Sequence, residues 1–200
     1  RGDGRSAITV KAMPGGKLAP RLARQGVQMY RSLAADAAFT YFNMLDPTIG
    51  GMAPAQVALR RAISLGYNVP EEIRNIRRGQ AIVGQGLLAP HTTGYSPQFK
   101  SEMGDYDPAR ARALLDLYGF FDRDGDGWRE RPDGSRLEIE MATEPEQIYR
   151  AYNEQWQKGM KAIGIRMVPL IKEWPEHLKA SRAGKLMMWG VGWSGGPDGD

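Results

Sequence analysis

The residues best suited to bind a ligand by charge form an acidic, glycine-rich stretch in the second half of the chain. Asp122, Asp124 and Asp126 stand at every second position, and Glu130 and Asp133 follow them. This spacing matches positions 1, 3, 5, 9 and 12 of the EF-hand calcium loop, whose oxygen ligands suit a hard cation. These five residues are therefore candidate ligands of a structural Ca²⁺.

Other features of the same stretch favour a turn without a metal. An aspartate in place of the last loop residue, Asp133, is too short for the usual bidentate contact, and Arg129 occupies a position that is normally apolar. The stretch leaves through Pro132 into a strand pattern instead of a helix, and Asp-Gly pairs are ordinary turn formers. We therefore predict no cofactor, with structural Ca²⁺ as the alternative.

A second candidate site is the glycine-rich segment 192–196, which reads G-x-S-x-G around Ser194. This pattern is typical of the nucleophile of serine hydrolases, in which the acid and the histidine follow the serine along the chain. Both histidines, His91 and His177, precede Ser194 instead. The favoured interpretation is a ligand-binding loop, with an aromatic face from Trp193 and accessible backbone N–H groups at Gly195; a serine hydrolase is the alternative.

Composition limits the class of protein. The chain has 200 residues, no cysteine and a formal net charge of +4. Disulfides, thiolate metal sites and a cysteine nucleophile are thereby excluded, and the lack of cysteine fits an extracytoplasmic bacterial protein. No apolar segment has the length of a membrane span or of a signal peptide, so we expect a piece of a longer protein whose export signal lies elsewhere.

A cluster of basic residues raises the question of nucleic-acid binding. The cluster lies on two neighbouring predicted helices, without the interleaved aromatic residues that a nucleic-acid surface uses. A solvated helix surface is the favoured interpretation, and we predict no nucleic-acid partner. The basic residues are Arg60, Arg61, Arg74, Arg77 and Arg78.

Proline and glycine mark the ends of the predicted elements. Helices are predicted at 54–66, 70–79 and 108–119, each opened by proline and closed by glycine. After position 136 strands alternate with helices, which predicts an α/β sheet with right-handed crossovers. Pro169 places its strand at a sheet edge or a bulge. The strands are expected at 137–141, 165–171 and 186–193, and the helices at 145–163 and 174–184.

Open α/β sheets bind ligands beyond the carboxyl ends of their strands. The glycine-rich loop with Trp193 and Ser194 follows the last predicted strand, so the sequence predicts a ligand-binding site there. Trp189 shares strand parity with Trp193, and we expect one of the two rings to pack inside while the other reaches the mouth of the site.

Several short motifs, taken in order, resemble one family. The order resembles the family 5 extracellular solute-binding proteins of bacterial ABC importers, of the peptide/nickel-binding type. Together the motifs span residues 39–200. They include Phe-Thr-Tyr-Phe-Asn-Met at 39–44, Ala-Leu-Arg-Arg-Ala-Ile at 58–63, Tyr-Asp-Pro at 106–108, Ile-Gly-Ile at 163–165, Glu-Trp at 173–174 and Gly-Trp at 192–193.

The resemblance implies a periplasmic or extracytoplasmic protein with two hinged lobes that closes on a ligand and delivers it to ABC permease subunits. Residues 1–38 would be the trailing part of lobe one or a linker. Residues 39–200 would be lobe two, a type II periplasmic-binding-protein-like lobe with a mixed sheet flanked by helices and truncated at its C-terminal end. The expected ligand-binding residues are Asn43, Trp174, Arg182, Trp193, Ser194, Gly195 and Asp198.

Two departures from the family pattern bear on the ligand. Peptide-binding relatives often carry an aspartate shortly after the tryptophan matching Trp193, where this chain has Gly196, and Asp198 lies nearby. An arginine that some relatives place three residues before that tryptophan is Gly190. A peptide or a similar small solute is the expected ligand; a sugar, an opine-like conjugate and a metal chelate are the alternatives.

Overall fold

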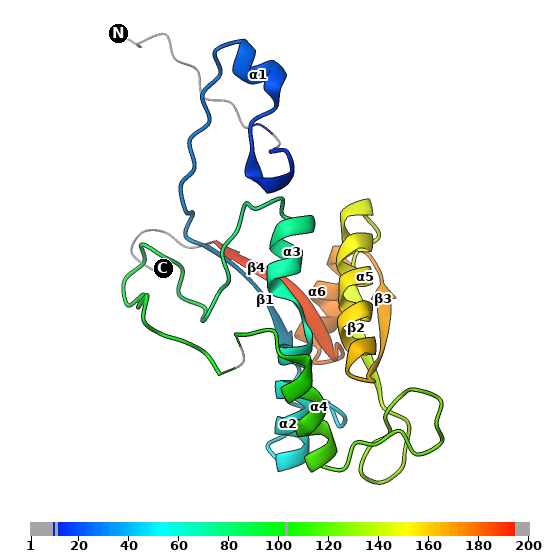
Figure 1. Ribbon diagram of the computed structural model, residues 1–200. Helices are drawn as coiled ribbons and strands as arrows, with labels where there is room; N and C mark the ends of the chain where they lie inside the picture. Colours follow the sequence, from blue (N-terminus) through cyan, green and yellow to red (C-terminus); the bar gives the residue numbers. More distant parts are fainter. Residues whose placement is uncertain (1–9, 11, 103, 195–200) are drawn as a thin grey trace.

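The computed structural model describes residues 10, 12–102 and 104–194 of the chain. A short 3₁₀ turn and a short helix come first, and a strand then leads into alternating helices and strands (Figure 1). The elements are η1 (Pro14–Gly16), α1 (Pro20–Arg24), β1 (Asp36–Phe42), α2 (Pro54–Gly66), α3 (Val69–Asn75), α4 (Pro108–Leu117), β2 (Glu138–Thr143), α5 (Gln147–Ala162), β3 (Arg166–Ile171), α6 (Trp174–Arg182) and β4 (Met188–Ser194).

The strands form one mixed sheet in the order β1-β4-β2-β3. β2 runs parallel to β3 and to β4, whereas β1 is antiparallel to β4. The predicted α/β class with a mixed sheet flanked by helices is confirmed. Pro169 lies in the edge strand β3, as expected, because proline has no backbone N–H to donate to a neighbouring strand.

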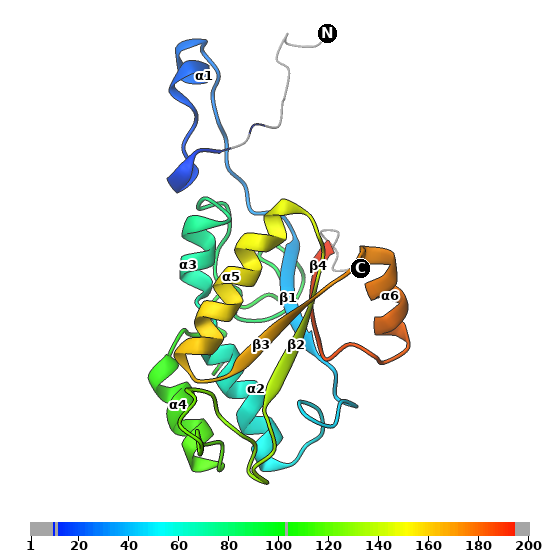
Figure 2. The same cartoon turned by 90° about the vertical axis from the view of Figure 1, so that its right-hand side faces the viewer.

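Helices cover both faces of the sheet (Figure 2). The larger core lies between the sheet and the helices α2, α4 and α5, and it contains Ile63, Leu115, Met160 and Met188. The smaller core lies under α6 and contains Leu186 and Trp189. Neighbouring residues of a strand point to opposite faces of the sheet, so Met188 packs in the larger core and Trp189 in the smaller one.

Capping residues explain where the helices begin. The side chain of Asn68 accepts a hydrogen bond from the backbone N–H of Glu71 at the start of α3. Asp107 does the same for Arg110 at the start of α4. The predicted bounds of α2 are confirmed, but α3 ends at Asn75, before the predicted Gly79. Beyond Asn75 the chain turns, and Gly79 adopts φ +76° while its N–H donates to the carbonyl of Ile73.

Helices α2 and α5 cross at a pair of glycines. A Cβ atom added to Gly159 would lie 2.6 Å from the carbonyl oxygen of Gly66, and one added to Gly66 would lie 2.8 Å from Cδ1 of Ile163. The sequence predicted Gly66 only as a helix end. The contact shows that both glycines are required for close packing of the two backbones.

Residues 12–35 lie away from the sheet (Figures 1 and 2). The guanidinium of Arg78 donates to the carbonyl of Ala12, and Arg31 donates to the carbonyl of Gly16. These bonds attach the segment to the end of α3 and fold it back on itself. Among the described residues, no helix combines the length and the apolar character needed to cross a membrane.

We predict that Gly159→Ala destabilises the protein although alanine is the better helix former. Alanine in a helix gains about 1 kcal/mol over glycine, whereas the added methyl group meets a backbone carbonyl that cannot rotate away. Overpacking of this kind costs about 1–3 kcal/mol. Urea unfolding followed by circular dichroism measures the difference.

The matched control is Gln157→Ala on the exposed side of the same helix, which we expect to change the free energy of unfolding by less than about 0.5 kcal/mol. A Gly159→Ala protein as stable as the wild type would show that the two helices do not approach this closely.

Candidate ligand-binding cleft

A large hollow lies at the carboxyl ends of the parallel strands β2 and β4. Its volume is about 2430 Å³, and it is open on one side. Thr143 and Glu144 border it where β2 ends, and Trp193 and Ser194 border it where β4 ends. This is the position that the sequence predicted for a ligand, since open α/β sheets bind solutes at this edge.

The end of β4 supplies an aromatic surface to the hollow. Trp193 is 63% exposed, whereas Trp189, four residues earlier on the same strand parity, is 3% exposed. One ring therefore packs inside, as expected, and the other is exposed and borders the hollow. Gly190 and Gly192 carry no side chains, so the backbone of β4 itself borders the hollow there.

Helix α5 forms the second wall. Tyr149, Tyr152 and Trp156 all border the hollow. Trp156 stacks on Tyr67, with the ring centroids 3.9 Å apart. Burial, followed by the charge of Glu72, raises the pKa of the Tyr67 hydroxyl well above its ordinary value. Tyr67 is therefore a neutral hydrogen-bond donor in the physiological range.

A buried ion pair fixes the base of this wall. The hydroxyl of Tyr67 donates to Oε2 of Glu72 at 2.7 Å, and Nε of Arg77 donates to Oε1 of the same carboxylate. Glu72 is 8% exposed, so its charge is buried with both a cation and a neutral donor. This arrangement satisfies the requirement that buried charges be paired and hydrogen-bonded.

The outer wall comes from segments without regular structure. Parts of 26–34 and 79–101 border the hollow, and several of their apolar side chains are exposed. Exposed apolar groups around a hollow are typical of a surface that contacts a ligand or another part of a protein. They include Tyr30, Leu33, Leu87, Leu88 and Phe99.

The predicted site residues do not all lie together. Trp193 and Ser194 border the hollow, but Asn43, Trp174 and Arg182 do not. The amide of Asn43 donates to the carbonyl of Gly184, below α6. Trp174 begins α6 on the opposite face of the sheet and lies against Trp189, at 6.4 Å between ring centroids. The predicted residues Gly195 and Asp198 lie outside the described residues.

The residues on the hollow that the sequence did not reveal as site residues include Glu144, Tyr149 and Tyr152. The helical spacing of Tyr152 and Trp156 predicted one inward face along the whole of α5. The structure shows that the end of this face near Tyr149 and Tyr152 lies beyond the core and borders the hollow instead. The sequence did contain a signal for this: the apolar face of α5 is longer than the neighbouring predicted strands, so part of it had to extend beyond the sheet.

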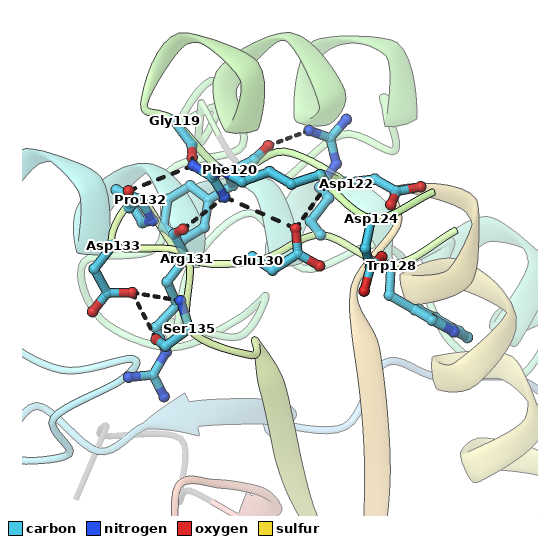
Figure 3. A network of polar contacts seen from close by, with 12 residues as sticks. Gly119, Phe120, Asp122, Asp124, Trp128, Glu130, Arg131, Pro132, Asp133 and Ser135 are labelled. Atoms are coloured by element: carbon cyan, nitrogen blue, oxygen red, sulfur yellow. Dashed lines mark hydrogen bonds and ion pairs between the residues drawn. The ribbon is translucent and has the colours of Figure 1, made fainter. Parts of the chain in front are cut away.

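The acidic stretch forms a turn held by its own carboxylates, and Figure 3 shows those of Glu130 and Asp133 accepting hydrogen bonds from residues of the same stretch. Asp122 accepts hydrogen bonds from the N–H groups of Gly125 and Gly127, at 2.7 and 2.9 Å. Asp124 accepts from the N–H of Asp126, whose own carboxylate accepts from the N–H of Trp128. These are the bonds that aspartates make in turns without a metal.

The candidate calcium ligands are only partly gathered. One oxygen from each of Asp122, Asp124, Asp126 and Glu130 lies within 4.8 Å of the others. Asp133 is not in this group: it accepts from the N–H and hydroxyl of Ser135, which lowers the pKa of its carboxyl (Figure 3). The loop is anchored to the body by a bond from Nε of Arg129 to the carbonyl of Ile163.

Comparison with known proteins identifies the family. Residues 7–200 match the bacterial extracellular solute-binding proteins, family 5 Middle. The chain belongs to this family. Family 5 comprises the peptide- and nickel-binding type of ABC-transporter solute-binding proteins, so the predicted resemblance is confirmed.

Two curated relatives come from Pseudomonas aeruginosa strain UCBPP-PA14. Di/tripeptide-binding protein 2 is 30% identical over 145 residues, covering 70% of this chain and 25% of the relative. Di/tripeptide-binding protein 1 is 25% identical over 147 residues, covering 70% and 24%. The chain therefore spans about a quarter of the length of these relatives.

Solved structures share the fold. The oligopeptide-binding protein AppA from Bacillus subtilis, in complex with a nonapeptide, matches with a TM-score of 0.74 and 19% identity, over 84% of this chain and 33% of AppA. A periplasmic oligopeptide-binding protein from Thermotoga maritima matches with a TM-score of 0.74 and 20% identity, over 90% and 35%. At these identities the likeness shows the fold alone.

Membership of family 5, a non-enzymatic class, excludes the serine hydrolase alternative for this chain. The structure gives the physical reason. Ser194 is the last residue of the extended strand β4 and lies opposite Asp36. His177, on α6, is fully buried with Nε2 at 2.8 Å from the carbonyl of Thr143, and His91 is exposed in a loop.

We predict that calcium does not stabilise this family 5 chain. The carboxylates of Asp122, Asp124 and Asp126 are exposed, that of Glu130 is half-buried, and all four are already bonded to backbone N–H groups. Asp126 and Glu130 also pair with Arg166 and Arg123. The measurement is the Tm in the presence of excess calcium and in the presence of a chelator. Equal values are expected, and a rise of several degrees with calcium would show that the acidic stretch is a metal site.

Proposed function

We propose that the protein is the substrate-binding component of an ABC importer and captures a short peptide or a similar small solute at the carboxyl ends of β2 and β4. The observation that carries the proposal is a hollow of about 2430 Å³ at this edge of the sheet, in a chain of family 5. Its aromatic walls and exposed strand backbone suit an extended ligand.

The names of the relatives support a peptide as the ligand. The curated relatives are di/tripeptide-binding proteins, and the structural neighbours include oligopeptide-binding proteins. Hollows lined by aromatic rings with few polar groups bind ligands mainly by apolar contact, and the polar groups then select among them. Trp193 offers the largest exposed ring of the described part of β4.

The remaining parts of the proposal follow from the family. Residues 39–200 would form most of lobe two, and residues 1–38 would be the trailing part of lobe one or a linker. The ligand would be enclosed when lobe one closes over the hollow, and the closed form would deliver it to the permease subunits at the membrane. The protein would act outside the cytoplasm of a bacterium.

Native mass spectrometry of the full-length protein tests the proposal. The wild-type protein, incubated with pooled di- and tripeptides, is expected to gain the mass of a bound solute or to retain one from its source. Trp193→Ala is expected to weaken binding about 30-fold, because a central aromatic anchor contributes ~2 kcal/mol or more to binding.

Trp128→Ala is the matched control, since Trp128 packs under Arg166 in the acidic turn and does not border the hollow. Trp174→Ala reports separately whether the site extends over α6. A protein that retains no solute and gains none from the pool, or a Trp193→Ala protein with unchanged affinity, would contradict the proposal.

A further inference from the structure

His177 is a polar side chain in apolar surroundings. It lies on α6, is fully buried and stands against Trp189, with 5.8 Å between the ring centroids. Trp189 and Leu186 belong to the smaller core of the protein. Nδ1 of His177 has no hydrogen-bond partner among the described residues. Because a buried polar atom without a partner is costly, an apolar side chain of similar size would stabilise this core better.

The other ring nitrogen makes the bond that explains the histidine. Nε2 of His177 lies 2.8 Å from the carbonyl oxygen of Thr143 and must be the donor, because a carbonyl only accepts. Thr143 is the last residue of β2. The same oxygen accepts a hydrogen bond from the backbone N–H of Lys172, the residue that follows β3. His177 therefore joins the first turn of α6 to the place where β2 and β3 both end.

The strand end that His177 holds borders the hollow. Thr143 and the next residue, Glu144, both line it, whereas His177 does not. The pairing of β2 with β4 ends before this point, with Ala142 opposite Trp189. Beyond that pair, the bond from His177 to Thr143 and the bond from the indole N–H of Trp189 to Glu144 hold the end of β2. The first bond comes directly from His177, and the second comes from a ring that packs against it.

We propose that His177 is a positioning residue for the solute site: it fixes the end of β2, so that the lining residues there meet the solute from a constant position. This inference rests on the proposed function and adds to it a residue that does not itself border the hollow. Supporting residues of this kind strengthen binding because the site is ordered before the solute arrives. A residue that only stabilises the fold would leave the affinity of the folded protein unchanged.

Three variants of the full-length protein separate positioning from stability. His177→Met fills the space with a flexible side chain that has no donor. His177→Gln keeps an N–H donor and places an oxygen where Nδ1 was. Ser181→Ala is the matched control on the same helix: the Ser181 hydroxyl shares a hydrogen bond of 2.6 Å with the hydroxyl of Tyr41 on β1, a strand that is not adjacent to β2.

Calorimetry measures the affinity of each folded variant for the di- or tripeptide that native mass spectrometry finds on the wild type after incubation with the pool. His177→Met is expected to weaken binding about tenfold, the scale of one orienting hydrogen bond. His177→Gln is expected to stay within about twofold of the wild type, because the donor is kept. Ser181→Ala is expected to bind like the wild type, although it and His177→Met both lower the midpoint of urea unfolding.

Hydrogen–deuterium exchange of the same variants gives a second measurement that needs no solute. Exchange at 143–149 should be faster in His177→Met than in the wild type, and unchanged in Ser181→Ala. Wild-type affinity in His177→Met, unchanged exchange at 143–149, or an equal loss of affinity in Ser181→Ala would overturn the positioning role and leave the proposed function standing. A wild type that binds no member of the pool would contradict the proposed function and this inference with it.

Discussion

The parallel pairing of β2 with β4 is the constraint on which the candidate site depends. The paired segment is short, with Met141 opposite Met188 and Ala142 opposite Trp189. It places the carboxyl end of β2 beside the start of β4, so that Trp189 reaches Glu144, which lies 45 residues earlier in the chain. The two strands run in the same direction and β4 continues beyond the end of β2, so that Thr143, Glu144, Trp193 and Ser194 all border one hollow.

The packing on the two faces of the sheet gives the hollow different walls. On one face α5 lies close to α2 through Gly66 and Gly159, and the exposed end of its apolar stripe becomes a wall of the hollow. On the other face α6 covers Trp189, with His177 completely buried. The first face thus offers surface to a ligand, while the second holds the polar groups of the site in position.

Local signals in the sequence were sufficient for the class and for most elements. Prolines, capping residues and alternating apolar positions predicted α2 and the strands around α5, and Pro169 predicted an edge strand. Long-range pairing could not be predicted in this way, since the partner of β4 depends on strands far along the chain. Glu144 was missed for the same reason. In the sequence it resembles a surface residue, because it stands beside a proline in a polar stretch. In the structure it is buried and accepts a hydrogen bond from Trp189, which is distant in the chain.

Hydrogen–deuterium exchange on the full-length protein, with and without a bound solute, tests the central claim most directly. The account predicts that binding slows exchange at 143–153 and 190–194, where the ends of β2 and β4 and the start of α5 border the hollow. The acidic turn at 122–134 should exchange at the same rate in both states. Protection confined to α6 or to the acidic turn, with none at the strand ends, would contradict it.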